Sequence, residues 1–287
     1  MVIDLHAHSS TSDGTSTPAE LMREAREAGL DVIALTDHDT AAGWDEATAA
    51  LPPGLTLIPG AELSCKWEHI EVHLLAYLFD PNYRDLSVAM ASLISDRSLR
   101  AKRMIDLIRA DGVEVTWDQV SEIADGGAVG RPHVARALVS SGVVETVDQA
   151  FAPDYLGRRW RLPKAALEIS EAIQLVRAAG GIPVLAHPRA TRRGPVVSNE
   201  LIAELAEVGL FGLEAHHTDH TDSERDELIA LAAKVGLAVT GSSDYHGENK
   251  TVQLGANTTS RETYEKLVAE SSGTVPRAFG NGSYMRS

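Results

Sequence analysis

The chain is short of several residue types, and each shortage excludes a class of protein. It has a single cysteine, Cys65, which rules out an intrachain disulfide framework and any zinc site built on paired thiolates. Aromatic residues make up only 5% of the 287 residues, which leaves little material for base-stacking platforms. No run approaches about 18 consecutive apolar residues. Since the first residues also show no signal-peptide pattern, we expect a cytoplasmic protein with no membrane partner.

Basic residues are also scarce relative to acidic ones. Lys and Arg together number 26 against 41 Asp and Glu, which gives a net charge of −15. Because proteins that bind duplex DNA nonspecifically use excess positive charge to displace counterions, long duplex DNA is not an expected partner. No obligate protein partner is evident either. An acidic total still permits a local cationic site, and the 11 histidines are the side chains to account for.

The order of the apolar runs predicts an α/β fold. Short β-branched runs alternate with amphipathic stretches, which is typical of parallel strands joined by helices. Seven strands are predicted, at Val2–Leu5, Val32–Leu35, Thr56–Ile58, Val72–Leu78, Ile182–Leu185, Gly212–Ala215 and Leu237–Thr240. Capping residues predict helices at Thr17–Gly29, Ser170–Gly180 and Thr221–Gly236. This pattern fits a closed barrel or an open doubly wound sheet.

After the fourth predicted strand only helical signals remain. A long helix is indicated by a stripe of five apolar residues, Leu93, Leu99, Met104, Leu107 and Ile108. Its arginines, Arg97, Arg100 and Arg103, are expected to form a solvated face. Shorter helices are predicted near Thr116–Ala124, Pro132–Ser140 and Thr146–Phe151. We therefore divide the chain into a barrel (residues 1–80 and 164–275), a helical insertion that caps the substrate (81–163) and a loosely held tail (276–287).

Histidines and carboxylates gather where the predicted strands end. The residues selected there as metal ligands are His6, His8, Asp13, His38, Glu62, His73, His187, Asp244 and His246. In β/α barrels the catalytic groups collect at the rim formed by the carboxyl ends of the strands. Because side chains at i and i+2 of an extended segment point the same way, His6 and His8 form a pincer, and Asp244 and His246 form another.

Each of these residues, taken alone, could also have a role other than metal binding. A lone histidine such as His69 or His133 is more often solvated or hydrogen-bonded than bound to a metal, and Asp13 could instead cap the helix that follows it. A whole set at one rim is different, because such a cluster buried without a metal would be costly. Imidazole and carboxylate without thiolate suit zinc, manganese or iron, and carboxylates can bridge two ions.

Taken together, the motifs resemble the PHP (polymerase and histidinol phosphatase) superfamily of metal-dependent phosphoesterases. The resemblance rests on DLHAHS (4–9), SDG (12–14), TDHD (36–39), PGAE (59–62), His73, AHP (186–188) and GSSDYHG (241–247). It implies a distorted (β/α)7 barrel, in agreement with the seven predicted strands. RPHVAR at 131–136 resembles part of the helical insertion found in the branch that acts on nucleotide phosphates. That branch includes 3′,5′-nucleoside bisphosphate phosphatases and 5′ to 3′ exoribonucleases.

Carried over position by position, the family pattern implies two to three divalent ions. The implied ligands are His6, His8, Glu62 and Asp244 for the first ion, Glu62, His73 and His187 for the second, and Asp13, His38 and His246 for the third. Glu62 would bridge two ions. Mn²⁺ is the expected metal, with Zn²⁺ or Fe²⁺ as alternatives.

The charge of such a site predicts its substrate and chemistry. Three divalent ions bring about +6, three carboxylates return about −3, and a bridging hydroxide leaves about +2, which fits a phosphate monoester dianion. We expect this hydroxide, held between ions that share Glu62, to attack phosphorus in line without a covalent intermediate. His217 or His220 is the candidate general acid, with a structural role as the alternative.

Residues around the ligands are assigned two further roles. Phosphate or nucleotide contacts are expected from Arg131, His133 and Arg189, because a guanidinium can grip phosphate with two hydrogen bonds. Three carboxylates next to the ligands are expected to orient their imidazoles, as is common at metal sites: Asp4, Asp37 and Asp39.

The sequence therefore favours a phosphoesterase that hydrolyses phosphate monoesters of nucleotides. Its substrates would be 3′,5′-nucleoside bisphosphates, nucleoside monophosphates or the 5′ ends of short RNA. One alternative is the same chemistry on another small phosphate ester, such as histidinol phosphate. A second is a metal-binding regulatory module that has lost catalysis, against which the complete ligand set argues.

Overall fold

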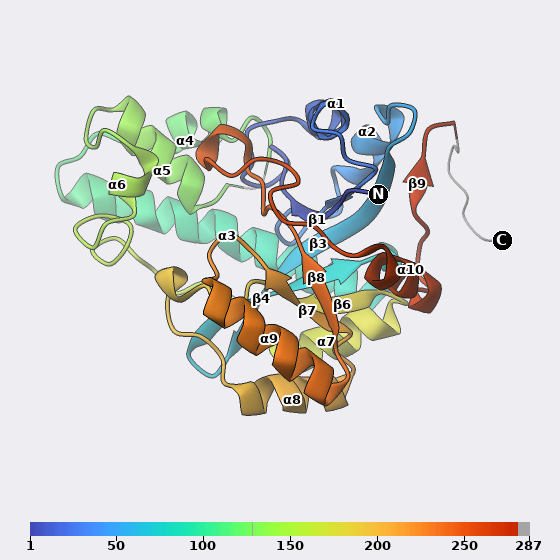
Figure 1. Cartoon of the computed structure of the whole chain (residues 1–287). Coiled ribbons are helices and arrows are strands. Elements are labelled where there is room, and N and C mark those ends of the chain that lie inside the picture. Colours follow the sequence, from blue (N-terminus) through green and yellow to red (C-terminus); the bar gives the residue numbers. More distant parts are fainter. Residues whose placement is uncertain (128, 281–287) are drawn as a thin grey trace.

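A nearly closed, barrel-shaped sheet forms the centre of the protein (Figure 1). The computed structural model describes residues 1–127 and 129–280. The sheet has the strand order β1-β2-β3-β4-β6-β7-β8. These strands are β1 Ile3–Ala7, β2 Val32–Leu35, β3 Thr56–Trp67, β4 Ile70–Tyr77, β6 Ile182–Leu185, β7 Gly212–His216 and β8 Ala238–Gly241. The two ends of the sheet approach each other where His8 N–H donates to the Tyr245 carbonyl at 2.9 Å, and the predicted seven-stranded barrel is confirmed.

One strand departs from the predicted parallel arrangement. β4 is antiparallel to both β3 and β6. The reason is a two-residue turn, Glu68-His69, between the paired residues Trp67 and Ile70, which is too short for anything but a hairpin. β3 is also much longer than predicted. Because β4 runs in the opposite direction, the half that carries His73 lies beside the second half of β3 and not at the far end of the barrel.

Helices cover the outside of the barrel. They are α1 Pro18–Glu27, α2 Trp44–Ala49, α7 Ile169–Ala178, α8 Asn199–Val208, α9 Asp222–Val235 and α10 Arg261–Glu270. α1, α7 and α9 follow the predicted helices, and α1 and α9 begin with complete capping boxes at Thr17 and Thr221. The sequence prediction missed α2, α8 and α10, although Ser198 and Ser260 cap the last two.

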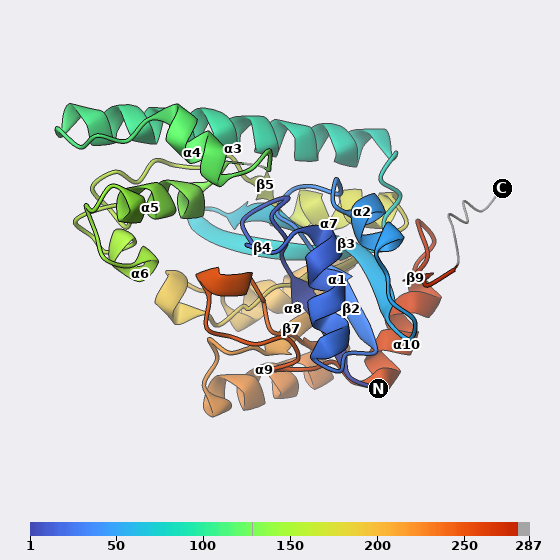
Figure 2. The same cartoon turned by 90° about the horizontal axis from the view of Figure 1, so that it is seen from above.

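Four helices of the insertion pack around an apolar cluster of their own. They are α3 Arg84–Ala110, α4 Trp117–Ile123, α5 Arg131–Ser140 and α6 Val147–Ala150. Residues such as Ile108, Leu138 and Trp160 form this cluster, whereas Leu86 and Met90, at the start of α3, pack into the barrel core. α3 therefore joins the two cores, and Figure 2 shows it crossing the width of the molecule. None of the helices in the described residues is long and apolar enough to cross a membrane.

The face of α3 that meets the rest of the protein matches the predicted one in part, since Leu93, Met104 and Ile108 are buried and Arg103 is exposed. Leu99 and Leu107 are 51% and 40% exposed, whereas Arg100 is only 8% exposed. The side chain of Arg97 is also largely covered, because it pairs with the buried Asp39. The prediction is wrong for Arg97 and Arg100, because apolar spacing carries no information about the charged rim beneath them.

The start of the predicted tail is held against the barrel. β9 Arg277–Ala278 pairs with Thr56 and Leu57 of β3, and Arg277 also donates to Asp45 at 3.0 Å. The prediction of a loose segment is therefore wrong for these residues, while residues 281–287 lie outside the described part of the chain. The other short strand, β5 Leu167–Glu168, also pairs with β3.

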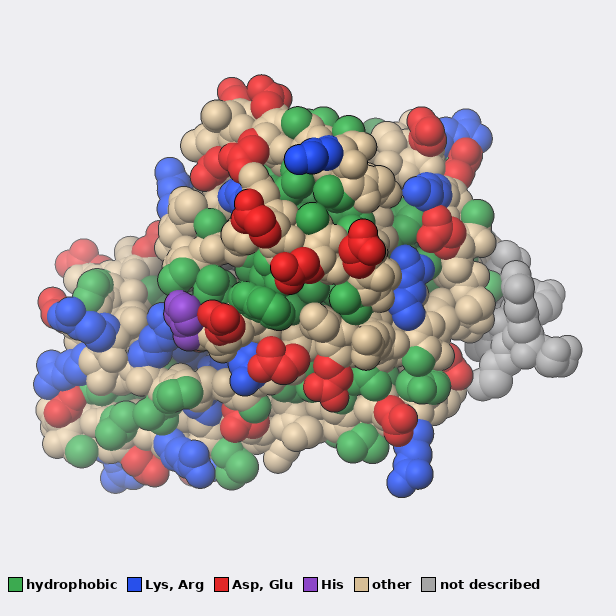
Figure 3. All heavy atoms as spheres, turned by 90° about the horizontal axis from the view of Figure 1, so that it is seen from below, with side chains coloured by type: hydrophobic (Ala, Val, Ile, Leu, Met, Phe, Trp, Pro, Cys, Tyr) green, Lys and Arg blue, Asp and Glu red, His purple; other side chains and the backbone are tan. Residues whose placement is uncertain are grey.

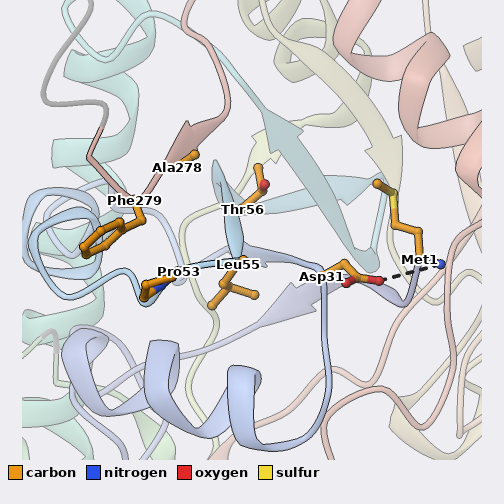
Figure 4. A pocket seen from close by; sticks show the side chains of 8 residues that line it. Met1, Asp31, Pro53, Leu55, Thr56, Ala278 and Phe279 are labelled. Carbon is orange, nitrogen blue, oxygen red and sulfur yellow. Dashed lines mark ion pairs between the residues drawn. The ribbon is translucent and has the colours of Figure 1, made fainter.

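A cavity of about 500 Å³ lies at the amino-terminal end of β3 (Figure 4). Its lining includes Met1, Asp31, Leu55, Ala278 and Phe279. Met1, Asp31 and Leu55 precede β1, β2 and β3, and Ala278 pairs with Thr56 at the start of β3. The predicted ligands instead lie toward or beyond the other ends of the parallel strands, or, for His73, beside the second half of β3. The cavity is therefore at the opposite end of the barrel from the residues expected to do chemistry.

Candidate metal centre

The predicted ligands are carried to one rim by abrupt turns at the strand ends. Three residues other than glycine have positive φ there, Asp39 at 58°, His187 at 28° and Asp244 at 53°. Such backbone conformations cost about 1–3 kcal/mol each and persist where the surrounding structure enforces them, often at functional sites. They turn the chain sharply while the side chains stay inside the barrel.

The first group of ligands lies at the end of β1 and contains both histidines of the first pincer. His6 and His8 are fully buried, and their Nε2 atoms are 3.0 Å apart. Glu62 Oε2 lies 3.3 Å from His6 Nε2 and 3.2 Å from His8 Nε2. Asp244 Oδ1 lies 3.4 Å from each of the same two nitrogens. Four ligand atoms from three separate segments therefore face one small volume.

Glu62 lies between this group and a second one. While its Oε2 faces the first group, its Oε1 lies 2.8 Å from His73 Nδ1 and 3.0 Å from His187 Nε2. The hairpin of β3 and β4 accounts for His73, because Ser64 pairs with His73 two residues beyond Glu62. A carboxylate with different imidazoles on its two oxygens has the arrangement needed to bridge two ions.

A third group surrounds Asp13. Asp13 Oδ2 lies 3.5 Å from His38 Nε2, and its Oδ1 lies 3.4 Å from His246 Nε2. His8 Nδ1 is 3.6 Å from Asp13 Oδ1, so the ring of His8 faces two groups, one with each nitrogen. His38 likewise turns its Nδ1 toward Glu62, at 3.2 Å. The structure thus brings all the predicted ligands together, and two histidines lie between neighbouring groups.

These groups match the requirements of divalent ions. Ligand atoms held about 2.0–2.2 Å from one ion lie roughly 3.0–3.6 Å apart in octahedral or tetrahedral geometry, and the distances above fall in or close to this range. His38 Nδ1 is buried and makes no hydrogen bond with any described residue. Nitrogen and oxygen donors without thiolate suit manganese, iron or zinc. The residues therefore fit the metals that the sequence implies.

Comparison with known proteins identifies the same family that the sequence motifs resemble. The PHP domain family matches residues 4–126. A Haemophilus influenzae protein named 5′-3′ exoribonuclease is 37% identical over 258 residues, which cover 88% of this chain and 93% of that protein. The chain belongs to the PHP family. A Chromobacterium violaceum protein named 3′,5′-nucleoside bisphosphate phosphatase is 32% identical over 253 residues, covering 85% and 87% of the two chains.

Solved structures extend the PHP likeness to the whole fold. A structure from Bifidobacterium adolescentis, assigned as a metal-dependent phosphoesterase, has a TM-score of 0.87 and 37% sequence identity, and the match covers 94% of this chain and 96% of that one. A Chromobacterium violaceum amidohydrolase solved with bound sulfate and no metal has a TM-score of 0.83 and 28% identity, and the match covers 94% and 97%. The resemblance found in the motifs is thus confirmed.

The PHP rim is strongly polarised. Burial acts to lower the pKa of His8, but contacts with Asp244 and Glu62 outweigh it and raise the pKa to about 9. Burial acts to raise the pKa of Glu62, but the charges of His73 and His38 hold it well below its usual range. At His8 the carboxylates outweigh burial, whereas burial lowers the pKa of His246 to about 3. A bound divalent ion would supply positive charge to the carboxylates and would need the imidazole nitrogens free of protons.

The predicted general acids lie close to the PHP rim, and both ring nitrogens of His220 are engaged. His220 Nδ1–H donates to the Ala215 carbonyl at 2.8 Å, and its Nε2 accepts from Arg189 N–H at 3.2 Å. With both nitrogens bound to backbone, His220 has no proton to give to a leaving group. His217 Nδ1 accepts from Asp219 N–H at 3.0 Å, whereas its buried Nε2 lies 3.4 Å from Asp244 Oδ2 and makes no hydrogen bond with any described residue. This nitrogen therefore stays available to the group around Asp244, and His217 remains the candidate general acid.

Two of the three predicted substrate contacts have other partners. Arg189 is buried, and its guanidinium donates to the Val197 carbonyl at 2.7 Å and to Asn199. It braces the loop after β6, so it does not offer a free fork to phosphate. His133 is buried as well, and its Nδ1 accepts from Gly130 N–H at 3.0 Å at the start of α5.

The three carboxylates expected to orient imidazoles hold other groups instead. Asp4 accepts from the backbone N–H groups of Ser243 at 3.0 Å and Gly255 at 2.8 Å. Asp37 accepts from Ser9 and Ser12, and Asp39 from Ser64 and Arg97. The prediction is wrong because the sequence shows which residues are neighbours of a ligand but not which way the carboxylates point.

Sequence reasoning also missed three charged residues at the site. Glu214 lies 3.2 Å from His6 Nδ1, Lys164 Nζ lies 3.1 Å from His73 Nε2, and Lys250 Nζ lies 2.7 Å from Asp244 Oδ2. A signal existed only for Glu214, which is a carboxylate inside an otherwise apolar strand. The two lysines lie in loops with no motif of their own.

Proposed function

We propose that this PHP-family phosphoesterase hydrolyses phosphate monoesters of nucleotides, namely 3′,5′-nucleoside bisphosphates, nucleoside monophosphates or the 5′ ends of short RNA. The observation that carries the proposal is the contact of one Glu62 carboxylate with ligand histidines on both of its oxygens. The names of the related proteins support nucleotide or RNA substrates. We place the enzyme in the cytoplasm, where such substrates occur.

The nine ligand residues would hold two to three ions in the sets that the family pattern implies, with Mn²⁺ as the expected metal. When bound, these ions supply activated water and neutralise charge on the transferring phosphoryl oxygens. Glu62 contacts both groups of histidines and so fixes their position relative to each other. His217 Nε2, 3.4 Å from Asp244 Oδ2, would be the group that protonates the leaving alcohol. The burial of these side chains excludes bulk water and strengthens their interaction with phosphate.

The insertion contributes cations beside the rim, and some of them form no ion pair with a described residue. Glu71 lies 2.7 Å from Arg161 and 3.6 Å from Lys164. Burial acts to raise its pKa, but the charges of Lys164 and Arg161 lower it to about 2, so it is ionised. Among the described residues, Arg131 and Arg100 have no carboxylate within ion-pair distance and donate no hydrogen bond to a protein group. On the face shown in Figure 3, Lys and Arg side chains gather toward the insertion.

The surplus of positive charge argues for a substrate with a second anionic group. Burial and the neighbouring charges of Arg97 and Arg131 lower the pKa of Arg100 to about 10, so these cations repel one another. An anion between them would relieve that repulsion. Arg131, which packs over Phe151 with its guanidinium carbon 5.7 Å from the ring centre, is the residue we propose to receive it. We propose that residues 81–163 act as a cap whose cations bind a phosphate other than the one that is cleaved.

A phosphate-release assay of the Mn²⁺-loaded enzyme tests the proposal. The panel contains a nucleoside 3′,5′-bisphosphate, a nucleoside 5′-monophosphate, a short 5′-phosphorylated RNA and histidinol phosphate. We expect the highest kcat/KM on a nucleotide substrate. Release from histidinol phosphate alone would reject the nucleotide assignment and keep the phosphoesterase class. Metal analysis of the same sample is expected to find two or three ions per chain, and fewer than two would reject the multinuclear site.

A further inference from the structure

Glu214 is a carboxylate enclosed in the barrel interior on β7. It is 1% exposed, and Leu213 and Ala215 on either side of it are fully buried. It belongs to none of the three groups of ligand atoms described above. A buried carboxylate with no partners would be strongly destabilising, so its partners show what holds it there.

Each oxygen of Glu214 accepts hydrogen bonds from segments that also carry metal ligands. Oε1 accepts from His6 Nδ1–H at 3.2 Å and from the hydroxyl of Ser242. Oε2 accepts from the backbone N–H of His187 at 2.9 Å. The three donors come from β1, from the end of β8 and from the turn after β6. A single side chain thus connects three parts of the rim.

The bond to His6 decides which nitrogen faces the ligand cluster. An ionised carboxylate only accepts hydrogen bonds, so the proton of His6 resides on Nδ1 and the lone pair on Nε2. That lone pair points toward His8 Nε2, Glu62 Oε2 and Asp244 Oδ1, at 3.0, 3.3 and 3.4 Å. Histidines that bind metal commonly donate their other N–H to such an acceptor, which fixes the tautomer and makes the ligand more basic.

The bond to His187 acts on the backbone. His187 has a φ of 28°, a conformation that a residue other than glycine adopts only when it is held. The hydrogen bond from its N–H to Glu214 helps to hold it, and it places the His187 ring 3.0 Å from Glu62 Oε1. Glu214 therefore touches both the group around His6 and the group around His187.

From this geometry we infer that Glu214 is a positioning residue that sets the metal affinity of the rim by orienting His6 and His187. The inference rests on the metal centre proposed above. It assigns Glu214 no contact with substrate or with an ion, because its oxygens lie on the far side of the His6 ring from the cluster. Its effect on hydrolysis is therefore indirect, through the ions that the oriented ligands retain.

The variant Glu214→Gln tests the inference without changing the size of the side chain. An amide can accept from His6 and Ser242 or from His187, but its NH₂ group then faces the remaining donor. We expect the Kd for Mn²⁺, measured by titration of the chelator-treated protein, to rise about 10- to 100-fold. We also expect the visible spectrum of the Co²⁺-loaded protein to change, since it reports the geometry of the ligands directly.

Thr240→Val is the matched control. Thr240 is also 1% exposed and is the register partner of Glu214 on β8, but its hydroxyl is 3.5 Å from the Leu213 carbonyl and touches no ligand. This variant is expected to lower the melting temperature and leave both metal measurements unchanged. If Glu214→Gln behaves in the same way, Glu214 is only structural and the inference is wrong.

Two further results distinguish a failure of this inference from a failure of the proposed metal centre or of folding. If the wild-type protein itself takes up no Mn²⁺, the proposed metal centre fails, whatever the variants show. If Glu214→Gln does not fold, Glu214→Asp replaces it, because this change keeps the charge and withdraws the carboxylate by one methylene. Weaker Mn²⁺ binding and a changed Co²⁺ spectrum in Glu214→Asp would support the inference, and wild-type values for both would overturn it.

Discussion

Arg97 on α3 donates to Asp39 at the end of β2, with 2.7 Å between Nη2 and Oδ2. Asp39 is 1% exposed and the side chain of Arg97 only 10%. The same carboxylate accepts from Ser64 N–H and from its hydroxyl, at 2.7 and 2.9 Å. This ion pair connects the long helix of the insertion to the metal rim. The two parts of the PHP protein are therefore linked at the site itself.

Arg97→Leu is expected to lower the free energy of unfolding by about 3–5 kcal/mol, because it leaves a buried carboxylate without its charged partner. Chemical denaturation measures the change. Arg159→Leu is the control, since Arg159 pairs with Asp111 on the surface of the insertion and its loss is expected to matter little. Equal effects of the two substitutions would contradict a special role for the Arg97–Asp39 pair.

Arg131→Met tests the proposed second phosphate site. Loss of a charged hydrogen bond to that phosphate, worth about 1.5–3 kcal/mol, is expected to raise the KM for a nucleoside 3′,5′-bisphosphate about 10- to 100-fold. A nucleoside with only the cleaved phosphate is expected to show a much smaller change. The same loss on both substrates would argue against a separate phosphate site.

Arg189→Met serves as the contrasting variant. Its guanidinium is engaged by the Val197 carbonyl and Asn199, so we expect a lower melting temperature and little change in the ratio of KM values for the two substrates. A selective rise in the KM for the bisphosphate would instead restore Arg189 as a phosphate contact.

Cys65 provides a test of the barrel interior. The thiol is fully buried in β3, and burial raises its pKa well above the usual value for cysteine. Since the thiolate is the reactive form, a thiol reagent at pH 8 is expected to leave the folded protein unmodified and to react with one thiol per chain in denaturant. Rapid reaction of the folded protein would show that β3 opens readily or packs differently.

The sequence predicts those parts of the structure that depend on residues close together in the chain. Strands such as β2 and β6 follow from local apolar runs, and helix α9 from the capping box at Thr221. The ligands follow because a parallel barrel brings its strand ends together, whichever helices join them. The antiparallel direction of β4 follows from the tight turn between Trp67 and Ile70. This turn is a local feature, but the expectation of parallel strands throughout the chain does not take it into account.

The sequence alone does not show which way a side chain points. Asp4 and Glu214 are both carboxylates beside the ligands, yet Asp4 accepts from backbone N–H groups and Glu214 from the ring of His6. Helix periodicity assigns Arg97 and Arg100 to solvent, because it carries no information about a buried carboxylate on another element. Such assignments depend on contacts between residues far apart in the chain.

Metal removal is expected to destabilise the protein, and the stabilisation by metal is expected to depend on Glu62. A ligand that binds only the folded state adds about 2.7 kcal/mol for each site when its free concentration is 100 times its Kd. Chelation is therefore expected to lower the melting temperature, and added Mn²⁺ to restore it. In Glu62→Gln the gain on adding Mn²⁺ should be much smaller and phosphate release should be abolished, because Glu62 contacts both groups of histidines.

His69→Gln is the control for this experiment, because His69 lies at the exposed tip of the β3–β4 hairpin with its side chain 79% exposed. It removes a histidine from the same hairpin that supplies His73, but not from the rim. We expect its Mn²⁺-dependent gain in melting temperature to equal that of the wild type. If Glu62→Gln also keeps the full gain, the ions do not bind between the two groups, and the bridging role of Glu62 is wrong even if the protein binds metal elsewhere.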